Sequence, residues 1–439
     1  MKNATLLTGC LTFFAFSVLA QPCASGRYAS NVFNTVDVTS NVTYGTNLNF
    51  LGSATTLKLD FYEPQGDTAT ARPLIIWVHG GSFLGGSKTD IDVQTLSERF
   101  AKKGYVCASI DYRTGFFPID SANAVKAVVR AQQDLKGAIR FFYKDRATTN
   151  TYKIDTTRIF IGGSSAGAIT ALHVGYLNDE CEISDYLSAA TITSLGGLEG
   201  ASGNPGYSTE VQGVINLCGA LARYSWLEAG DVPLCSIHGT ADATVKYNRG
   251  IVNPGTALMY LDGSRMLFER SCALSHPHNF YTFPNAPHVP YAGTSASALA
   301  YMDTTENFVR DFLIQQFGCT DANLQEPNMP METANLYAIN YCDGSPVDEV
   351  CLTSAISENT LATFEMYPNP TKDLVTLSWK SEGEKSIFIV DLAGRVVHYQ
   401  NAYSGHITLD VSQLKSGNYL VQIVDVNTTE SSNRQLMID

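Results

Sequence analysis

The chain has 439 residues, a hydrophobic content of 44% and a formal net charge of −13. A length of this order accommodates two or three domains, and the apolar content is sufficient for a sizeable core. The acidic balance, without a basic stripe, argues against nucleic acid and against an anionic membrane surface as partners.

Residues 1–20 have the pattern of a secretory signal peptide. Lys2 precedes an apolar run, and Val18-Leu19-Ala20 stands before Gln21 like a small-residue cleavage site. The run is too short to cross a membrane, and no later stretch is long enough, so we expect no integral membrane span. Cys10 lies inside the apolar run, which argues against a lipoprotein.

The cysteines fall into two groups. Cys107, Cys218 and Cys235 lie in strand-like apolar runs, where cysteine commonly acts as a small buried hydrophobe. The others could form disulfides in an oxidising compartment, with a connectivity that the sequence leaves open: Cys23, Cys181, Cys272, Cys319, Cys342 and Cys351. C-x-x-C and H-E-x-x-H patterns are missing from the sequence, so we expect no metal site and no cofactor.

Strand-like and helix-like segments alternate from about residue 56. The predicted strands are 56–64, 72–81, 104–113, 158–165, 211–220, 232–240 and 279–285. The predicted helices are 91–104, 120–144, 166–177 and 295–318. Apolar strands separated by helices predict an α/β fold with a doubly wound, mostly parallel sheet, in which sites form at the carboxyl ends of the strands.

Three segments break this alternation. Residues 184–208 are rich in Gly, Ser and Thr and predict a long loop or small lid, and residues 320–361 predict a linker. Residues 362–439 contain short alternating strands divided by Gly, Asn and Ser, which is typical of a small β-sandwich. We therefore expect an α/β domain over residues 21–319, the linker over 320–361, and a β domain over 362–439.

The stretch Gly163-Ser164-Ser165-Ala166-Gly167 matches G-x-S-x-G between a predicted strand and a predicted helix. In that context the pattern lifts a nucleophilic serine to the top of the sheet; the alternative is a tight turn without chemistry. Ser165 has glycines at both −2 and +2, whereas Ser164 has glycine at −2 and alanine at +2. We therefore predict Ser165 as the nucleophile.

A serine nucleophile needs a base and an orienting acid, which in this pattern follow in the order Ser, acid, His. His288 follows the last predicted strand, whereas His276 and His278 precede it; a structural histidine or a metal cluster of these three is the alternative. Asp242 follows the strand 232–240, and its alternative is a loop residue or helix cap. Asp111 and His173 are interpreted as structural.

The stretch His79–Phe83, with the letters HGGSF, follows the predicted strand 72–81. Its two glycines allow backbone N–H groups to point into a cleft. We predict Gly81, Ser82 and Ala166 as the donors of an oxyanion hole, in which each donor contributes on the order of 10²–10³ to the rate.

These motifs, HGGSF, GGSSAG, HGTAD and APHVPY, resemble the α/β-hydrolase fold, in its HGG-bearing carboxylesterase and lipase branch that includes bacterial feruloyl and acetyl esterases. The resemblance covers about residues 50–318, including DLKGAIRFF before the nucleophile strand. Ser82 stands where many relatives have a third glycine, which leaves its N–H available. The resemblance implies a secreted serine hydrolase of carboxylic esters, acting through an acyl-enzyme.

The tail, with YPNPTKDLVTLSW, DLAGRVV and LDVSQLKSGNYLVQI, resembles the C-terminal sorting domain of the type IX secretion system of Bacteroidetes. This implies export through the periplasm of a Gram-negative bacterium, with the type IX machinery as a partner and a secreted or surface location. A carbohydrate-binding β-module is the alternative. For the whole chain, a prolyl-oligopeptidase-type peptidase and a non-catalytic binding protein remain as alternatives to the esterase.

Overall fold

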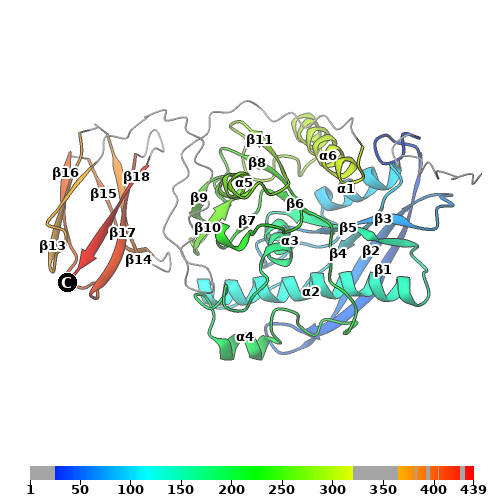
Figure 1. The fold of residues 1–439 in the computed structure, drawn as a ribbon, viewed down its shortest axis with the longest axis horizontal. Helices are drawn as coiled ribbons and strands as arrows, with labels where there is room; N and C mark the ends of the chain where they lie inside the picture. Colours follow the sequence, from blue (N-terminus) through cyan, green and yellow to red (C-terminus); the bar gives the residue numbers. More distant parts are fainter. Residues whose placement is uncertain (1–24, 320–363, 381–382, 392–395, 404, 426–430) are drawn as a thin grey trace, which may run out of the picture.

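The computed structural model describes residues 25–319 and 364–439, apart from 381–382, 392–395, 404 and 426–430 (Figure 1). The predicted signal peptide and linker, together with Cys23, Cys342 and Cys351, lie outside the described residues.

An eight-stranded sheet forms the centre of the first domain, in the order β1-β2-β4-β3-β5-β6-β8-β11. β1 pairs antiparallel with β2 and β2 antiparallel with β4, and all later neighbours are parallel. The strands are β1 (Val36–Leu48), β2 (Ala54–Pro64), β3 (Arg72–Val78), β4 (Val106–Ile110), β5 (Ile154–Ser164), β6 (Val214–Leu217), β8 (Leu234–Gly239) and β11 (His278–Phe283). The predicted α/β-hydrolase fold class is thereby confirmed.

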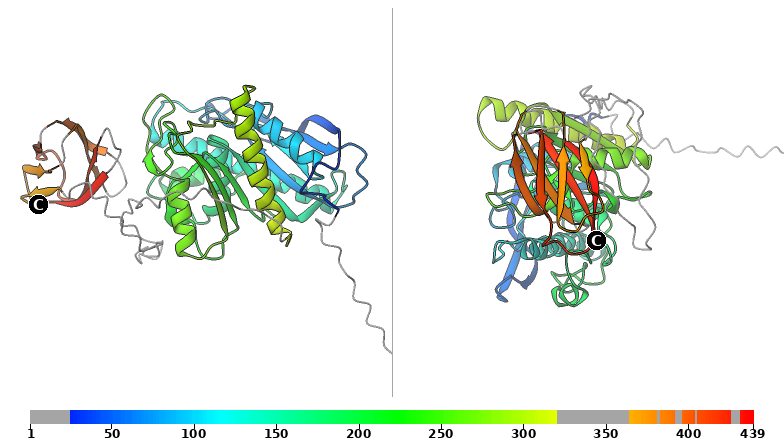
Figure 2. Two further views of the ribbon diagram at one scale, coloured as in Figure 1. Left: turned by 90° about the horizontal axis from the view of Figure 1, so that it is seen from above. Right: turned by 90° about the vertical axis from the view of Figure 1, so that its left-hand side faces the viewer.

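Helices cover both faces of this sheet, because successive residues of its central strands point to opposite sides. In β3, Ile75 and Trp77 join the core beneath α1 and α6, while Leu74 and Ile76 join the core beneath α2 and α3. α6 lies beside α1 in the view from above (Figure 2). The helices are α1 (Ile91–Lys102), α2 (Ser121–Ala147), α3 (Ala166–Tyr176), α4 (Ala189–Leu195), α5 (Ser264–Ala273) and α6 (Ala296–Gln316).

Several short elements differ from the sequence prediction. β1 was not expected, and its pairing with β2 contains irregularities near Thr39 and Thr43 that interrupt its period of two. The sequence did not predict the helix α5 or a second small sheet with the strand order β7-β10-β9. The strands of this small sheet are β7 (Ala220–Leu221), β9 (Arg249–Ile251) and β10 (Tyr260–Gly263). The segment predicted as a loop or lid, 184–208, contains the helix α4.

The described cysteines divide as the sequence suggested. Cys107, Cys218 and Cys235 are free and buried in the sheet region. Cys181, Cys272 and Cys319, from the group expected to pair, are disulfide-bonded.

The C-terminal residues fold into two facing antiparallel sheets, β12-β13-β16 and β15-β14-β17-β18. Their inner residues, among them Val375, Leu377, Ile389 and Val421, form a separate hydrophobic core. This is the predicted small β-sandwich. The strands are β12 (Glu365–Tyr367), β13 (Leu374–Ser378), β14 (Lys385–Asp391), β15 (Val396–Ala402), β16 (His406–Asp410), β17 (Gly417–Asp425) and β18 (Ser431–Ile438).

Candidate active site

Ser165 occupies a sharp turn between β5 and α3. Its backbone lies at φ 54° and ψ −119°, a conformation that L-residues rarely adopt. The flanking glycines are required by close backbone approach: a Cβ on Gly163 would lie 2.3 Å from the Val78 oxygen, and one on Gly167 would lie 1.9 Å from the same atom. The turn therefore depends on glycine at both −2 and +2 of Ser165.

The two adjacent serines have different surroundings. Ser164 is 1% exposed, and its Oγ accepts a hydrogen bond from the Tyr291 hydroxyl at 3.2 Å. Ser165 is 7% exposed, and its Oγ lies 2.8 Å from His288 Nε2. Only Ser165 is therefore in contact with a base.

His288 lies between Ser165 and Asp242. Its Nδ1 is 2.6 Å from Asp242 Oδ2. Because a carboxylate only accepts hydrogen bonds, Nδ1 carries the proton and Nε2 is left to accept the Ser165 hydroxyl proton. The structure thus brings together the three residues that the sequence order predicted, at the carboxyl ends of β5, β8 and β11.

The alternative metal cluster of His276, His278 and His288 is not formed. His278 begins β11, whereas His288 follows the end of that strand. His276 Nε2 bonds the Val232 carbonyl at 3.0 Å, and His278 Nδ1 bonds the His276 carbonyl at 2.8 Å. His276 and His278 therefore lie at the amino end of β11, opposite to the end that carries His288.

The Asp242 carboxylate is buried and accepts four hydrogen bonds. Its Oδ1 accepts from the backbone N–H groups of Thr244 and Val245, both at 2.9 Å. Its Oδ2 accepts from His288 and, at 3.2 Å, from His238 Nε2. Burial raises the pKa of Asp242, but the hydrogen bonds from His238 and then His288 outweigh it and hold this pKa well below its usual range.

The loop after β3 lies against the nucleophile turn. Gly81, Ser82 and Phe83 have φ values of 102°, 57° and 60°, so three consecutive residues are left-handed. Among the described residues, the backbone N–H groups of Gly81, Ser82 and Ala166 have no hydrogen-bond acceptor. Unpaired N–H groups beside a serine are the arrangement that an oxyanion hole requires.

An apolar pocket with a cavity volume of about 70 Å³ opens beside Ser165. It is lined by Phe83 from the loop after β3, Val125 and Val128 from α2, and Ile169 and His173 from α3. Further lining residues include Ile183, Tyr186, Ala222, Trp226, Val252, Leu258, Met259 and Leu261. A pocket of this composition suits an apolar group bound next to Ser165.

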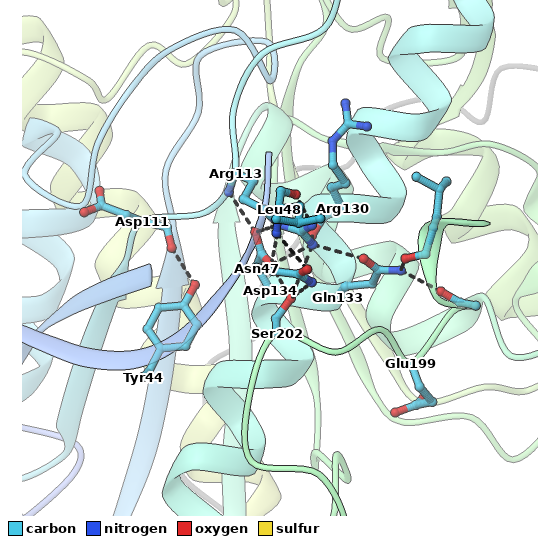
Figure 3. Close-up of polar contacts among 12 residues, drawn as sticks. Tyr44, Asn47, Leu48, Asp111, Arg113, Arg130, Gln133, Asp134, Glu199 and Ser202 are labelled. Atoms are coloured by element: carbon cyan, nitrogen blue, oxygen red, sulfur yellow. Dashed lines mark hydrogen bonds and ion pairs between the residues drawn. The ribbon is translucent and has the colours of Figure 1, made fainter. Parts of the chain in front are cut away.

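A second buried polar cluster lies away from the nucleophile, between β1, the end of β4, α2 and the loop after α4 (Figure 3). Asp134 of α2 accepts hydrogen bonds from the Arg113 backbone N–H at 2.8 Å and from Arg113 Nε at 2.9 Å. Ser202 donates to Asp134 at 2.5 Å, and Asn47 donates to Ser202 at 3.0 Å. This cluster fastens the loop containing Ser202 to the helix before the nucleophile strand.

Two residues at the site were not assigned a function from the sequence. His238 lies in the predicted strand 232–240 and was given no role there, yet its Nε2 lies 3.2 Å from Asp242 Oδ2. His173, interpreted as structural, also lines the pocket, and burial lowers its pKa to about 4. Asp111, likewise interpreted as structural, accepts the Lys88 backbone N–H at 2.8 Å. The burial of an imidazole and the partner of each nitrogen have no signal in the sequence.

Two family models match the chain. Residues 59–219 match the BD-FAE family, and residues 365–439 match the secretion system C-terminal sorting domain. The two family models thus match separate parts of the chain. The predicted resemblance to esterase-type hydrolases and the predicted sorting domain are both confirmed, and the sorting domain indicates secretion or export to the cell surface.

Individual relatives match shorter stretches. Gut esterase 1 of Caenorhabditis elegans is 27% identical over 150 residues, which are 34% of this chain and 25% of that protein. Lipase 1 of Geotrichum candidum is 26% identical over 146 residues, 32% of this chain and 26% of the lipase. Carboxylesterase 3B of Mus musculus is 31% identical over 115 residues, 26% of this chain and 19% of the esterase. The chain thus spans about a quarter or less of these relatives.

Among solved structures, Thermogutta terrifontis esterase 2 phosphorylated by paraoxon is similar, with 22% identity and a TM-score of 0.48. The similarity covers 64% of this chain and 94% of that esterase. The apo form of the same esterase has 21% identity and a TM-score of 0.47, and covers 65% of this chain and 96% of the other. Among the described residues, no helix combines the length and apolar character needed to cross a membrane.

Proposed function

We propose that this protein is a secreted serine hydrolase that cleaves carboxylic esters through Ser165, His288 and Asp242. The observation that carries the proposal is the 2.8 Å contact between Ser165 Oγ and His288 Nε2 at the mouth of an apolar pocket. A serine hydroxyl becomes an effective nucleophile when a base within hydrogen-bond reach accepts its proton.

In the proposed reaction, Ser165 Oγ attacks the ester carbonyl carbon while His288 Nε2 takes the hydroxyl proton. The negative charge that develops on the carbonyl oxygen is bound by the N–H groups of Gly81, Ser82 and Ala166. His288 then donates its proton to the leaving alcohol, which departs and leaves the acyl group on Ser165. Water, activated by His288, hydrolyses this acyl-enzyme and restores the serine.

Asp242 supports both proton transfers. Its carboxylate holds the Nδ1–H of His288, and so fixes the tautomer in which Nε2 accepts a proton from Ser165. The lowered pKa of Asp242 keeps this carboxylate ionised while His288 carries its transient positive charge. The proposed cycle needs no metal or cofactor.

The apolar pocket supports an ester whose acyl or alcohol part is a compact apolar group. Its walls come from α2, α3 and the segments around Trp226 and Leu258. We expect activity to rise when an acetyl ester is lengthened to butanoyl or hexanoyl, because each buried methylene contributes about 0.8 kcal/mol.

The sorting domain and the apolar leader support the remaining parts of the proposal. Residues 1–20 would direct the chain to the periplasm, and the type IX machinery would export it by residues 362–439. Residues 21–319 would then act as the catalytic domain, joined to the tail by 320–361. Expression in a type IX-competent host, with and without 362–439, and location of the enzyme in medium, periplasm or cell surface would test this.

The test of the activity uses nitrophenyl esters of increasing acyl length. Ser165→Ala should lower kcat by at least about 10⁴-fold, as expected for loss of a triad nucleophile. The matched control is Ser164→Ala, which removes the neighbouring hydroxyl and should keep kcat within about tenfold, or 1.4 kcal/mol. Full activity in Ser165→Ala would contradict the proposal, and peptide cleavage without ester cleavage would favour a peptidase.

A further inference from the structure

We infer that His238 is a positioning residue for this reaction, holding the Asp242 carboxylate where it meets His288. The inference rests on the proposed function, because it concerns the acid of the proposed triad. His238 belongs to β8 and is fully buried, and its Nε2 lies 3.2 Å from Asp242 Oδ2.

The hydrogen-bond partners of His238 fix the orientation of its ring. Its Nε2 also lies 2.9 Å from the Val245 carbonyl oxygen, which only accepts, so Nε2 carries a proton. Its Nδ1 lies 2.7 Å from the Ser264 hydroxyl, which also accepts a hydrogen bond from Asn216 Nδ2 at 2.9 Å. The Nε2–H of His238 is therefore shared between the Val245 carbonyl and the Asp242 carboxylate.

This N–H completes the set of donors around Asp242. Oδ1 receives two backbone N–H groups, and Oδ2 receives the N–H groups of His238 and His288. A carboxylate with four donors in a buried setting has one favourable orientation. Without His238, Asp242 Oδ2 would accept a hydrogen bond only from His288. The carboxylate could then rotate out of the orientation in which it meets His288 Nδ1.

Two further ionisable groups lie near this carboxylate, and burial raises the pKa of both. Cys218 lies within 4.8 Å of the Asp242 and His288 ligand atoms, and burial raises the pKa of its thiol to about 12. Burial raises the pKa of Tyr291 well above its usual value. The Tyr247 ring packs edge-on against His238 at 5.8 Å, and its hydroxyl bonds Thr282 Oγ1 at 2.8 Å.

The test compares two amide substitutions that differ by one methylene. The Gln amide nitrogen can occupy the place of imidazole Nε2, so His238→Gln keeps a donor toward Asp242. The Asn amide occupies the place of Nδ1, so His238→Asn keeps a polar group toward Ser264 and withdraws the donor from Asp242. The full chain of each variant would be assayed on a nitrophenyl ester for kcat, KM and the pH dependence of kcat/KM.

We expect His238→Asn to lower kcat by about 10- to 100-fold, the range found when a partner that orients a functional histidine is lost. KM should change little, because His238 does not line the pocket. The acid limb of kcat/KM should move to lower pH, because a carboxylate that has turned away from His288 stabilises its protonated form less strongly. His238→Gln should restore most of kcat and return the limb toward its wild-type position.

Equal losses in the Gln and Asn variants, or an unmoved acid limb in a folded Asn variant, would overturn the inference. If His238→Asn fails to fold, the test rests on His238→Gln. A Gln variant that folds but loses 10-fold or more in kcat also contradicts the inference. Ser165→Ala separates the two hypotheses. An inactive Ser165→Ala beside indistinguishable His238 variants refutes only the role of His238, whereas an active Ser165→Ala refutes the proposed function itself.

Discussion

Two buried polar networks among the described residues use similar groups in different ways. The cluster around Arg113 and Asp134 is closed: its charges are satisfied by Gln133, Ser202 and backbone carbonyls, as Figure 3 shows. The network from His238 through Asp242 to Ser165 is open, because it ends at a hydroxyl beside the apolar pocket.

This difference suggests that the closed cluster stabilises the fold, whereas the open network takes part in the proposed reaction. In the closed cluster, Asp134 is paired directly with a guanidinium, so both charges are permanent and no proton needs to move. In the open network, Asp242 contacts two imidazoles, and imidazole is the side chain most often used for proton transfer. We therefore expect changes in the open network to affect the rate, and changes in the closed cluster to affect stability.

The largest expected effect is on the rate, from Asp242→Asn. An amide at this position can present an N–H to His288 Nδ1 and favour the wrong tautomer, so kcat should fall by about 10³–10⁴-fold. Burst and steady-state kinetics on a nitrophenyl ester would measure this loss.

Asp111→Asn is the matched control, because Asp111 also follows the end of a strand in the same sheet but contacts Lys88. Its kcat should stay within about tenfold of the wild type, or 1.4 kcal/mol. A comparable loss in both variants would show that any acid at this sheet edge is required, and would contradict the distinction between the two networks.

The next effect is on stability, from Arg113→Leu. The substitution leaves Asp134, which is fully buried, without its cation, and unpairing a buried ion pair costs about 3–5 kcal/mol. Urea unfolding of the full chain should show this loss, while kcat per active site, titrated with a serine-reactive phosphonate, should change less than about tenfold.

Asp303→Asn provides the control for an exposed ion pair. Arg99 contacts Asp303 at 2.5 Å, but the Asp303 side chain is 62% exposed, so its loss should cost at most about 1 kcal/mol. If Arg113→Leu is as mild as Asp303→Asn, or if it removes activity from the folded protein, the closed cluster is not purely structural.

Much of the fold could be predicted because its main elements have long, regular patterns. The helix α2 repeats apolar residues at intervals of three or four, and the strand β3 is apolar from Pro73 to Val78. β7, with two residues, and β9, with three, are too short to show a period of two. Their position depends on pairing with β10, which is a long-range contact.

The candidate site divides in the same way. Ser165 and the glycines around it could be named because a sharp turn restricts residue types, and His288 and Asp242 because chain order and strand ends restrict position. Their catalytic roles remain predictions. His238 could not be assigned, because its relation to Asp242 depends on which imidazole nitrogen faces Val245 and which faces Ser264.

The last prediction concerns the pH dependence of stability and His173, which lines the pocket beside Ser165. His173 is buried, and its Nδ1–H donates to the Ile169 carbonyl at 2.7 Å. Burial lowers the pKa of His173 from 6.5 to about 4 in the folded protein. As the pH falls, this imidazole is therefore protonated in the unfolded chain before it is protonated in the folded one. The free energy of unfolding should therefore decrease from pH 6.5 to about pH 4, by about 3 kcal/mol for a shift of this size, and no further below.

His173→Phe removes this titration and keeps an aromatic ring beside Trp226, whose ring lies 5.6 Å from the imidazole. Urea unfolding would be measured at pH 7, 6, 5 and about 4.5. The free energy of unfolding of the variant should rise relative to that of the wild type as the pH falls. Tyr176→Phe is the control in the same helix, since burial raises the pKa of Tyr176 far above this range and its difference from the wild type should stay constant. If the His173→Phe difference is equally constant, the imidazole does not titrate as a buried neutral base, and the pocket is more hydrated than its apolar lining implies.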